Sequence, residues 1–142
     1  MNKSSFEEIL KRDGRLIYSH VGDSMRPLLR DERDLLVIEP IGERPKRYDI
    51  VLFRRDSGRA VMHRIIKCRK TDYLLCGDNQ WCPEAGITDR HIIGKLTAVI
   101  RNGKEYRLAG WRYRAYVFLW CGLFPLRALL LKVRYKLKHL KR

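Results

Sequence analysis

The stretch HIIGKLTAVIRNGKEY, residues 91–106, contains the strongest local indication of fold in this sequence. It joins a long run rich in β-branched residues to the pair Asn102 and Gly103. Asn-Gly is preferred in two-residue hairpin turns, because both positions of such a turn need a positive φ. We therefore predict a β-hairpin that turns between Val99 and Tyr106, and with it an antiparallel sheet.

Five other segments have the same character: each is short, rich in β-branched and aromatic residues, and bounded by Gly, Pro, Asp or Asn. They are residues 15–21, 34–40, 49–55, 60–68 and 73–77. The sequence therefore predicts a mainly β, antiparallel domain over residues 15–108. A chain of 142 residues with 45% hydrophobic content suits one domain of this kind rather than two.

Residues 1–14 predict a short amphipathic helix ahead of this domain. Ser4 or Ser5 can cap its N-terminus, two glutamates follow in the first turn, and Gly14 suits its C-terminal end. The stretch is polar and charged and contains no long apolar run. We therefore expect neither a cleavable signal peptide nor an N-terminal transmembrane anchor.

The strand pattern stops after Gly110, and residues 109–142 predict a helical tail: one helix, a break at Pro125 and a second helix. The longest apolar run of the tail, residues 115–126, is shorter than the roughly 20 residues that a membrane-spanning helix needs. In the second helix the apolar residues share one face, and basic residues cover the remainder. The apolar face comprises Leu126, Leu129, Leu130, Val133 and Leu137.

Lys and Arg outnumber Asp and Glu by 31 to 16, so we expect an anionic partner. Ten of the basic residues, and no carboxylate, lie in residues 107–142. An apolar helix face with basic flanks, and with Trp111 and Trp120 nearby, is typical of an interfacial helix on an anionic membrane. We therefore expect residues 111–142 to attach the protein peripherally to the cytoplasmic face of a membrane. The alternative is a helix that packs on the β domain with its charged side in solvent.

The sequence argues against nucleic acid as that anionic partner. No helix-turn-helix segment precedes the β domain, and the Leu and Trp content of the tail exceeds what contacts with phosphate need.

The cysteine spacing disfavours a metal site and a disulfide framework. The four cysteines form no CxxC pair and have no histidine at zinc-finger spacing; they are Cys68, Cys76, Cys82 and Cys121. We expect reduced thiols, no metal and no cofactor.

The stretch HVGDSMRPLLRDERD, residues 20–34, raises the question of whether Ser24 is a nucleophile or an ordinary turn residue. A serine becomes a nucleophile only when a base takes its proton and nearby donors hold the oxyanion. Of the four histidines, His63 stands inside a predicted strand that can hold an imidazole rigidly, and an imidazole accepts a proton near neutral pH. By itself, a histidine in a strand is more often structural than catalytic.

Five segments in order resemble the membrane-associated serine peptidases that include signal peptidase I, with the related self-cleaving LexA-like repressor domains. GDSMRP is similar to the nucleophile box Ser-Met-x-Pro of that family, and GDNQ to its Gly-Asp-Asn box. The segment RYDIVLFRR resembles its Gly-Asp-Ile-Val-x-Phe strand, with Tyr48 where glycine is common. The other two matching segments are RDERDLLVIEP and IIGKLTAVI. The resemblance implies the antiparallel β fold of signal peptidase and LexA.

The resemblance also implies catalytic roles. Bacterial signal peptidases and LexA-like domains use a lysine base, whereas the endoplasmic-reticulum and archaeal branch places His-Arg in a strand before Gly-Asp-Asn, as MHRII does here. Transferred to this chain, Ser24 is the nucleophile and His63 the general base. Glu84 stands where that branch has an assisting acid, and Asp78 is the rival acid. Such a carboxylate would orient the imidazole and stabilise its protonated form.

Two residues beside the nucleophile are implied to shape the oxyanion and substrate site. Gly22 stands where many bacterial relatives have a serine whose hydroxyl joins the oxyanion hole. The hole must then use backbone donors, including the amide of Ser24, and Gly22 would permit a tight backbone approach. Met25 lines the substrate site if the resemblance extends to it, and otherwise packs in the core.

The sequence thus predicts a serine endopeptidase of the signal-peptidase type that cleaves a peptide or leader segment at or near a membrane. Two alternatives stay open at this point. One is a LexA-like β domain with a basic tail that binds nucleic acid or cleaves only itself. The other is an inactive, membrane-docked scaffold.

Overall fold

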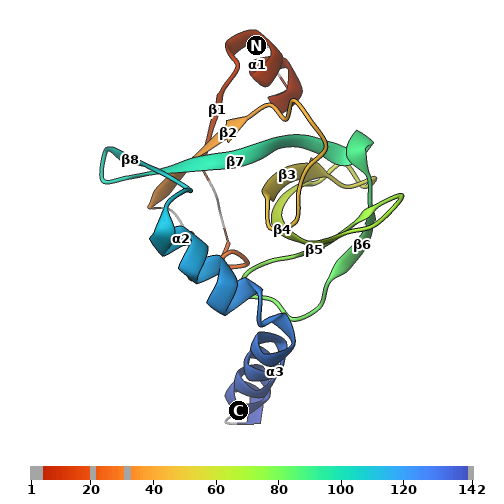
Figure 1. The fold of residues 1–142 in the computed structure, drawn as a ribbon, viewed down its shortest axis with the longest axis vertical. Coiled ribbons are helices and arrows are strands. Elements are labelled where there is room, and N and C mark those ends of the chain that lie inside the picture. The colour runs from red at the N-terminus through yellow and green to blue at the C-terminus, as the bar shows by residue number, and fades with distance from the viewer. Residues whose placement is uncertain (1–4, 20–21, 31–32, 141–142) are drawn as a thin grey trace.

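A computed structural model describes residues 5–19, 22–30 and 33–140 of the chain. Within them a β domain lies between a short N-terminal helix and a C-terminal helical tail (Figure 1). The elements in order are α1 (Phe6–Asp13), β1 (Leu16–Ser19), β2 (Asp34–Glu39), β3 (Ile50–Arg54), β4 (Ala60–Cys68), β5 (Tyr73–Cys76), β6 (Glu84–Ile87), the 3₁₀ turn η1 (Asp89–His91), β7 (Ile92–Arg101), β8 (Lys104–Arg107), α2 (Trp111–Tyr116), the π-helical turn η2 (Val117–Cys121) and α3 (Phe124–Leu140).

The strands form one antiparallel sheet in the order β1-β2-β7-β3-β4-β5-β6, with β8 also paired to β7. The register shifts at irregularities in four of the strand pairs, including those of β3 with β7 and of β4 with β5. Such irregularities bend strands and increase their twist. The sheet accordingly curls, so that β3 to β6 curve round beneath β7 (Figure 1). The predicted antiparallel β fold is confirmed.

The predicted hairpin is confirmed as the β7–β8 pair, in which Arg101 is paired with Lys104. Asn102 and Gly103 have φ values of 53° and 72°, the positive values that the tight turn needs.

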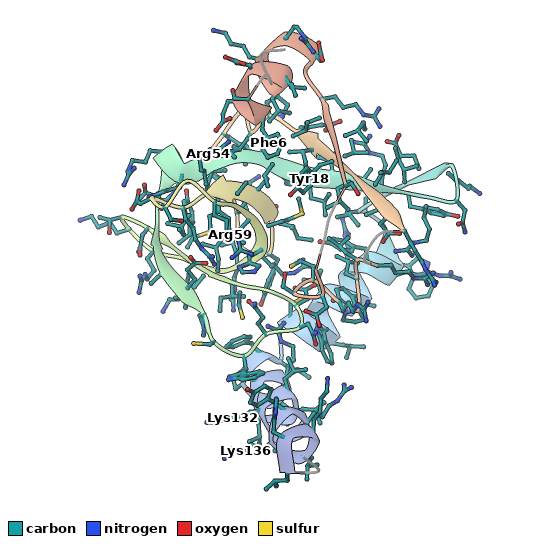
Figure 2. The ribbon with its side chains drawn as sticks, turned by 180° about the vertical axis from the view of Figure 1, so that it is seen from behind. Phe6, Tyr18, Arg54, Arg59, Lys132 and Lys136 are labelled. Atoms are coloured by element: carbon teal, nitrogen blue, oxygen red, sulfur yellow. The ribbon has the colours of Figure 1, made fainter. Side chains whose placement is uncertain are left out.

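The N-terminal helix is also confirmed. Ser5 caps α1 in a capping box with Glu8, and Gly14 ends the helix with a φ of 68°. Phe6 of α1 packs edge-on against Tyr18 of β1, with ring centroids 5.3 Å apart (Figure 2). Positions 1–4 of this predicted segment, and positions 20–21 of the first predicted strand, lie outside the described residues.

Strand β3 is buried on both faces, because its alternate side chains belong to two separate core clusters. Ile50 and Leu52 pack in the cluster that also receives α1, whereas Val51 and Phe53 pack in the second cluster. All of β3 pairs with the first half of β4, residues 60–64, and this register places His63 opposite Val51. The imidazole is therefore carried by one of the most rigidly packed parts of the sheet.

Strand β6, which contains Glu84, is absent from the strands that the sequence predicted. The sequence Glu-Ala-Gly-Ile has little intrinsic strand preference, so its conformation depends on pairing with β5.

The predicted break in the tail lies earlier than expected. The structure bends by 67° between Cys121 and Phe124, whereas Pro125 falls inside the first turn of α3. A proline suits that position because the first-turn N–H groups have no helical partner to lose. Within the described residues no single helix is long and apolar enough to cross a membrane, although the two bent parts together have the length and composition to do so.

Candidate active site

Ser24 lies on a turn that follows β1 and is anchored to the core by its neighbour. The Met25 side chain is fully buried and packs in the same cluster as Leu36 and Met62. The amide of Leu29 donates to the Met25 carbonyl at 3.0 Å. In the structure Met25 thus has the packing role that the sequence offered as the alternative to lining the substrate site, and it fixes the base of the serine turn.

Gly22 has a φ of 111°, which side-chain-bearing residues rarely adopt. A Cβ built there would meet no heavy atom of the described residues within 4 Å. The backbone conformation therefore favours glycine at this position, and its role beside the oxyanion stays a prediction.

The Gly-Asp-Asn box, residues 77–79, holds the serine turn directly. The Asn79 amide donates to the Ser24 carbonyl at 2.8 Å, and the Asn79 side-chain amide donates to the Asp23 carbonyl at 3.1 Å. A Cβ on Gly77 would lie only 2.5 Å from the Ser24 carbonyl oxygen. The two loops are therefore in contact with no room for a side chain between them.

His63 is 5% exposed and lines a cavity of about 500 Å³. The cavity wall continues through Gln80, the residue after the box that holds Ser24. The other residues that line it are Arg55, Trp81, Cys82, Pro83 and Glu84. The loop of residues 77–84 thus connects the serine turn to the histidine and to an open cavity of a size typical of small-ligand and peptide side-chain sites.

Glu84 is the candidate acid that lies beside the imidazole. Its Oε2 is 3.9 Å from His63 Nδ1, which is a charge contact and longer than a hydrogen bond. Both Glu84 oxygens accept from Arg55, at 2.6 and 2.8 Å. This hydrogen-bonded carboxylate raises the pKa of Arg55. Glu84 is therefore held in place by Arg55, with one oxygen turned toward the imidazole.

Asp78 has a different environment. Its carboxylate accepts from Arg64 Nε and Nη2, both at 2.9 Å, and from the Tyr116 hydroxyl at 2.7 Å. Arg64 and Asp78 are both fully buried. Burial opposes the charge of Arg64, but the hydrogen bonds to Asp78 outweigh it, and the pKa of Arg64 is raised. Burial, followed by the nearby Asp78 charge, raises the pKa of Tyr116. Asp78 is thus the centre of a buried structural network.

Sequence reasoning did not assign roles to Arg55, Arg64 or Tyr116. The His-Arg pair in β4 was visible as part of the resemblance. Nothing local in the sequence pairs Arg64 with a carboxylate 14 positions later, or that carboxylate with a tyrosine 38 positions further on.

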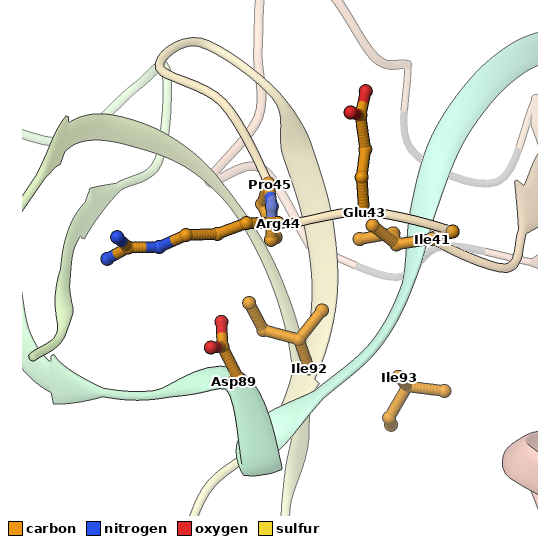
Figure 3. A pocket seen from close by; sticks show the side chains of 8 residues that line it. Ile41, Glu43, Arg44, Pro45, Asp89, Ile92 and Ile93 are labelled. Atoms are coloured by element: carbon orange, nitrogen blue, oxygen red, sulfur yellow. The ribbon is translucent and has the colours of Figure 1, made fainter.

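A second cavity, of about 290 Å³, lies between the segment 41–45 and the start of β7 (Figure 3). The side chains of Arg44 and Glu43 point in different directions (Figure 3). Arg44 donates to the Tyr73 hydroxyl and to the Arg69 carbonyl. The residues described along this cavity include no serine, cysteine or histidine, so it lacks the Ser-His pair that a serine hydrolase needs.

A turn-borne serine, a buried strand histidine and a carboxylate next to that histidine are the components of a serine hydrolase. The chain belongs to the Peptidase S24-like family, whose model matches residues 5–97. It is therefore a peptidase domain of the LexA and signal-peptidase superfamily, as the order of its sequence boxes indicated. The match ends within β7, so β8, α2, η2 and α3 lie outside it. No curated protein and no solved structure matches the chain.

Proposed function

We propose that this protein is a serine endopeptidase of the signal-peptidase type, which uses Ser24 and His63 to cleave a peptide or leader segment at or near a membrane. One observation carries the proposal. The buried His63 faces a cavity whose wall includes both the acid Glu84 and the loop that binds the Ser24 turn. The His-Arg order in β4 favours the histidine branch of the superfamily.

In this proposal the Ser24 Oγ attacks the scissile carbonyl carbon, and the hydroxyl proton passes to His63. The C–N bond then breaks, and the protonated imidazole gives its proton to the leaving amine. Water attacks the resulting Ser24 ester, again with His63 as base, and the serine is restored when the acid product leaves. The backbone amide of Ser24 contributes to the oxyanion hole, since Gly22 has no hydroxyl.

Glu84 would stabilise the protonated imidazole through its charge. At 3.9 Å the interaction is electrostatic, and Arg55 offsets part of it. The substrate peptide is inferred to lie extended beside the cavity, where β6 forms the end of the sheet and exposes Ala85 and Gly86.

A fluorophosphonate probe tests the nucleophile. We expect covalent labelling of the wild-type protein, mapped by mass spectrometry to the peptide that contains Ser24, and no labelling of Ser24→Ala. His63→Gln should slow the labelling strongly because the base is lost. If the wild-type protein neither reacts with the probe nor cleaves any peptide, the peptidase proposal fails. In cells, the peptide that accumulates uncleaved with Ser24→Ala identifies the substrate.

We also propose that the tail docks on an anionic, cytoplasmic membrane face. The predicted apolar face of α3 is uncovered in the structure, with its five residues 45–64% exposed. Lys132 and Lys136 project outward from the same helix (Figure 2). Trp111, Phe118 and Leu119 extend the exposed apolar surface along α2 and η2. Aromatic and aliphatic groups with a basic flank match the interface of an anionic leaflet.

Sedimentation with anionic vesicles and a titration with duplex DNA, at one salt concentration, test this attachment. We expect tight vesicle binding that depends on residues 111–142, and weak DNA binding. Tight DNA binding without vesicle binding would instead favour the nucleic-acid-binding alternative.

A further inference from the structure

We propose that the helical tail is a working part of the active site, in which Tyr116 and Trp120 are positioning residues for the Ser24 turn. This inference rests on the proposed peptidase function. Tyr116 and Trp120 lie outside the part of the chain matched by the family model, residues 5–97.

Tyr116 and Trp120 bind the same residue from two sides. The Tyr116 hydroxyl donates to the Asp78 carboxylate at 2.7 Å, and Trp120 Nε1 donates to the Asp78 backbone carbonyl at 2.8 Å. Asp78 is fully buried and is the central residue of the Gly-Asp-Asn box. The tail therefore fixes both the side chain and the main chain of that box.

The tail also contacts the histidine strand. Arg64, the residue after His63, donates from Nη1 to the Tyr113 hydroxyl at 2.9 Å and to the Tyr48 carbonyl at 2.9 Å. Tyr48 has a φ of 75°, a costly conformation for a bulky residue, and it stands where the related sequences commonly have glycine. The strained backbone of Tyr48 is therefore held by Arg64, which also binds Tyr113 of the tail.

Helix α3 adds a third contact through Arg127, which is buried although it has exposed apolar neighbours on the same helix. Its Nη2 lies 3.3 Å from the Gln80 carbonyl and 3.5 Å from the Gly77 carbonyl. Trp81 packs on Tyr135 of α3 with ring centroids 5.2 Å apart. The loop that forms the cavity wall is thus held by both helical parts of the tail.

The Gly-Asp-Asn box in turn contacts the turn that carries Ser24. Asn79 donates to the Ser24 carbonyl, and Gly77 leaves no space in which the serine turn could shift toward the box. From Tyr116 to Ser24 the path consists of two hydrogen bonds and the backbone of adjacent residues. Because a misplacement of about 1 Å can cost about 100-fold in rate, small displacements of the box should be measurable in kcat.

The tail therefore has two faces with separate tasks. The inner face holds the box, and the outer face of α3 remains exposed. Variants of the two faces should separate catalysis from membrane binding.

The experiment compares Tyr116→Phe and Trp120→Phe with the outer-face control Leu129→Ser in the full-length protein. Each inner-face variant removes one donor; Tyr116→Phe keeps the ring, and Trp120→Phe keeps an aromatic ring of smaller size. The assay is hydrolysis of a soluble peptide without membranes, together with the rate of fluorophosphonate labelling at Ser24. We expect the inner-face variants to lower kcat about 10- to 100-fold with little change in KM, and to slow labelling, while both bind anionic vesicles normally. Leu129→Ser should keep wild-type kcat and weaken vesicle binding.

Alkylation of the buried Cys121 reports whether the tail is still docked. Lost kcat with Cys121 protected shows that the hydrogen bonds position the site. Lost kcat with Cys121 reactive shows that docking of the tail is required, which also supports the inference. Wild-type kcat and labelling in either inner-face variant overturns it. A wild-type protein that neither cleaves nor labels instead overturns the proposed function.

Discussion

At the residue scale, the two candidate acids differ in what surrounds them. Asp78 is fully buried with both oxygens bound by Arg64, whereas Glu84 shares its oxygens with Arg55 at the edge of an open cavity. A buried ion pair contributes little net stability as a pair, but removing one partner leaves an uncompensated buried charge. Asp78 should therefore matter for stability, and Glu84 for the histidine beside it.

We predict that Asp78→Ala lowers the free energy of unfolding by about 3–5 kcal/mol, because it leaves the buried Arg64 without its carboxylate. Urea denaturation followed by tryptophan fluorescence measures the change. Asp56→Ala is the matched control: its carboxylate pairs with Arg90 and His91 but is mostly exposed, so this variant should lose much less stability than Asp78→Ala. Equal losses in the two variants would contradict the structural role of Asp78.

We predict that Glu84→Gln lowers kcat roughly tenfold, which corresponds to about 1.4 kcal/mol of lost stabilisation of the imidazolium. The expected loss is modest because the carboxylate is 3.9 Å from His63 and is partly neutralised by Arg55. Steady-state cleavage of a peptide substrate measures it, with the exposed Glu43→Gln as control. A wild-type kcat in Glu84→Gln would remove Glu84 from the mechanism.

At the element scale, the segment from α2 through η2 is bound to the β domain by hydrogen bonds from Tyr116 and Trp120 to Asp78. The Gly122 amide bonds to the Val117 carbonyl at 2.8 Å, an i to i+5 contact that forms a turn wider than an α-helical one. Within this turn Trp120 donates a hydrogen bond to the Asp78 carbonyl, and the side chain of the next residue, Cys121, is buried. Helix α3 contacts the loop of residues 77–84 through Arg127 and Tyr135, and its apolar face stays exposed.

This packing predicts a pattern of thiol reactivity. Burial raises the pKa of both Cys76 and Cys121 to about 11, so at pH 8 only about one thousandth of each is thiolate. Iodoacetamide at pH 8 should label the exposed Cys68 and Cys82 in the folded protein and reach Cys76 and Cys121 only after unfolding. Labelling of these two thiols should accelerate as pH rises toward 11. Peptide mapping by mass spectrometry follows each site, and rapid native labelling of Cys121 would show that the tail does not dock.

At the scale of the whole molecule, a net charge of +15 is combined with an exposed apolar surface on the helical tail. The β domain buries most of its apolar residues in two clusters, and most exposed leucines lie on the tail, of which α3 extends away from the domain (Figure 1). Charge alone would attract any polyanion, and the exposed apolar face is the reason that we propose a partner which also offers hydrocarbon.

We predict that Lys132→Glu with Lys136→Glu weakens binding to anionic vesicles more than tenfold, since each basic residue near such a surface contributes about 1 kcal/mol. The matched control is Lys67→Glu with Lys70→Glu, which makes the same change of charge on the β4–β5 hairpin and should have a smaller effect. Co-sedimentation at several salt concentrations measures both. Equal losses would show that net charge, rather than the tail, directs binding.

Much of the fold was predictable because its signals are local. The Asn102–Gly103 turn, the Ser5 cap and the Gly14 stop each act within a few residues of the chain. Strand β6 escaped prediction because its conformation comes from pairing with β5, and the tail bend was misplaced because Pro125 is tolerated inside a first turn.

The sequence by itself determined the antiparallel strands, their hairpin turn, the terminal helices, and the serine and histidine as the pair worth testing, since each rests on local chemistry or on the order of short motifs. Only the tertiary structure decided that Asp78 is bound by Arg64 and Tyr116 while Glu84 lies beside His63. It also decided that the tail has one docked face and one exposed face. These choices depend on which distant side chains lose water together, and burial of that kind leaves no pattern in the local sequence.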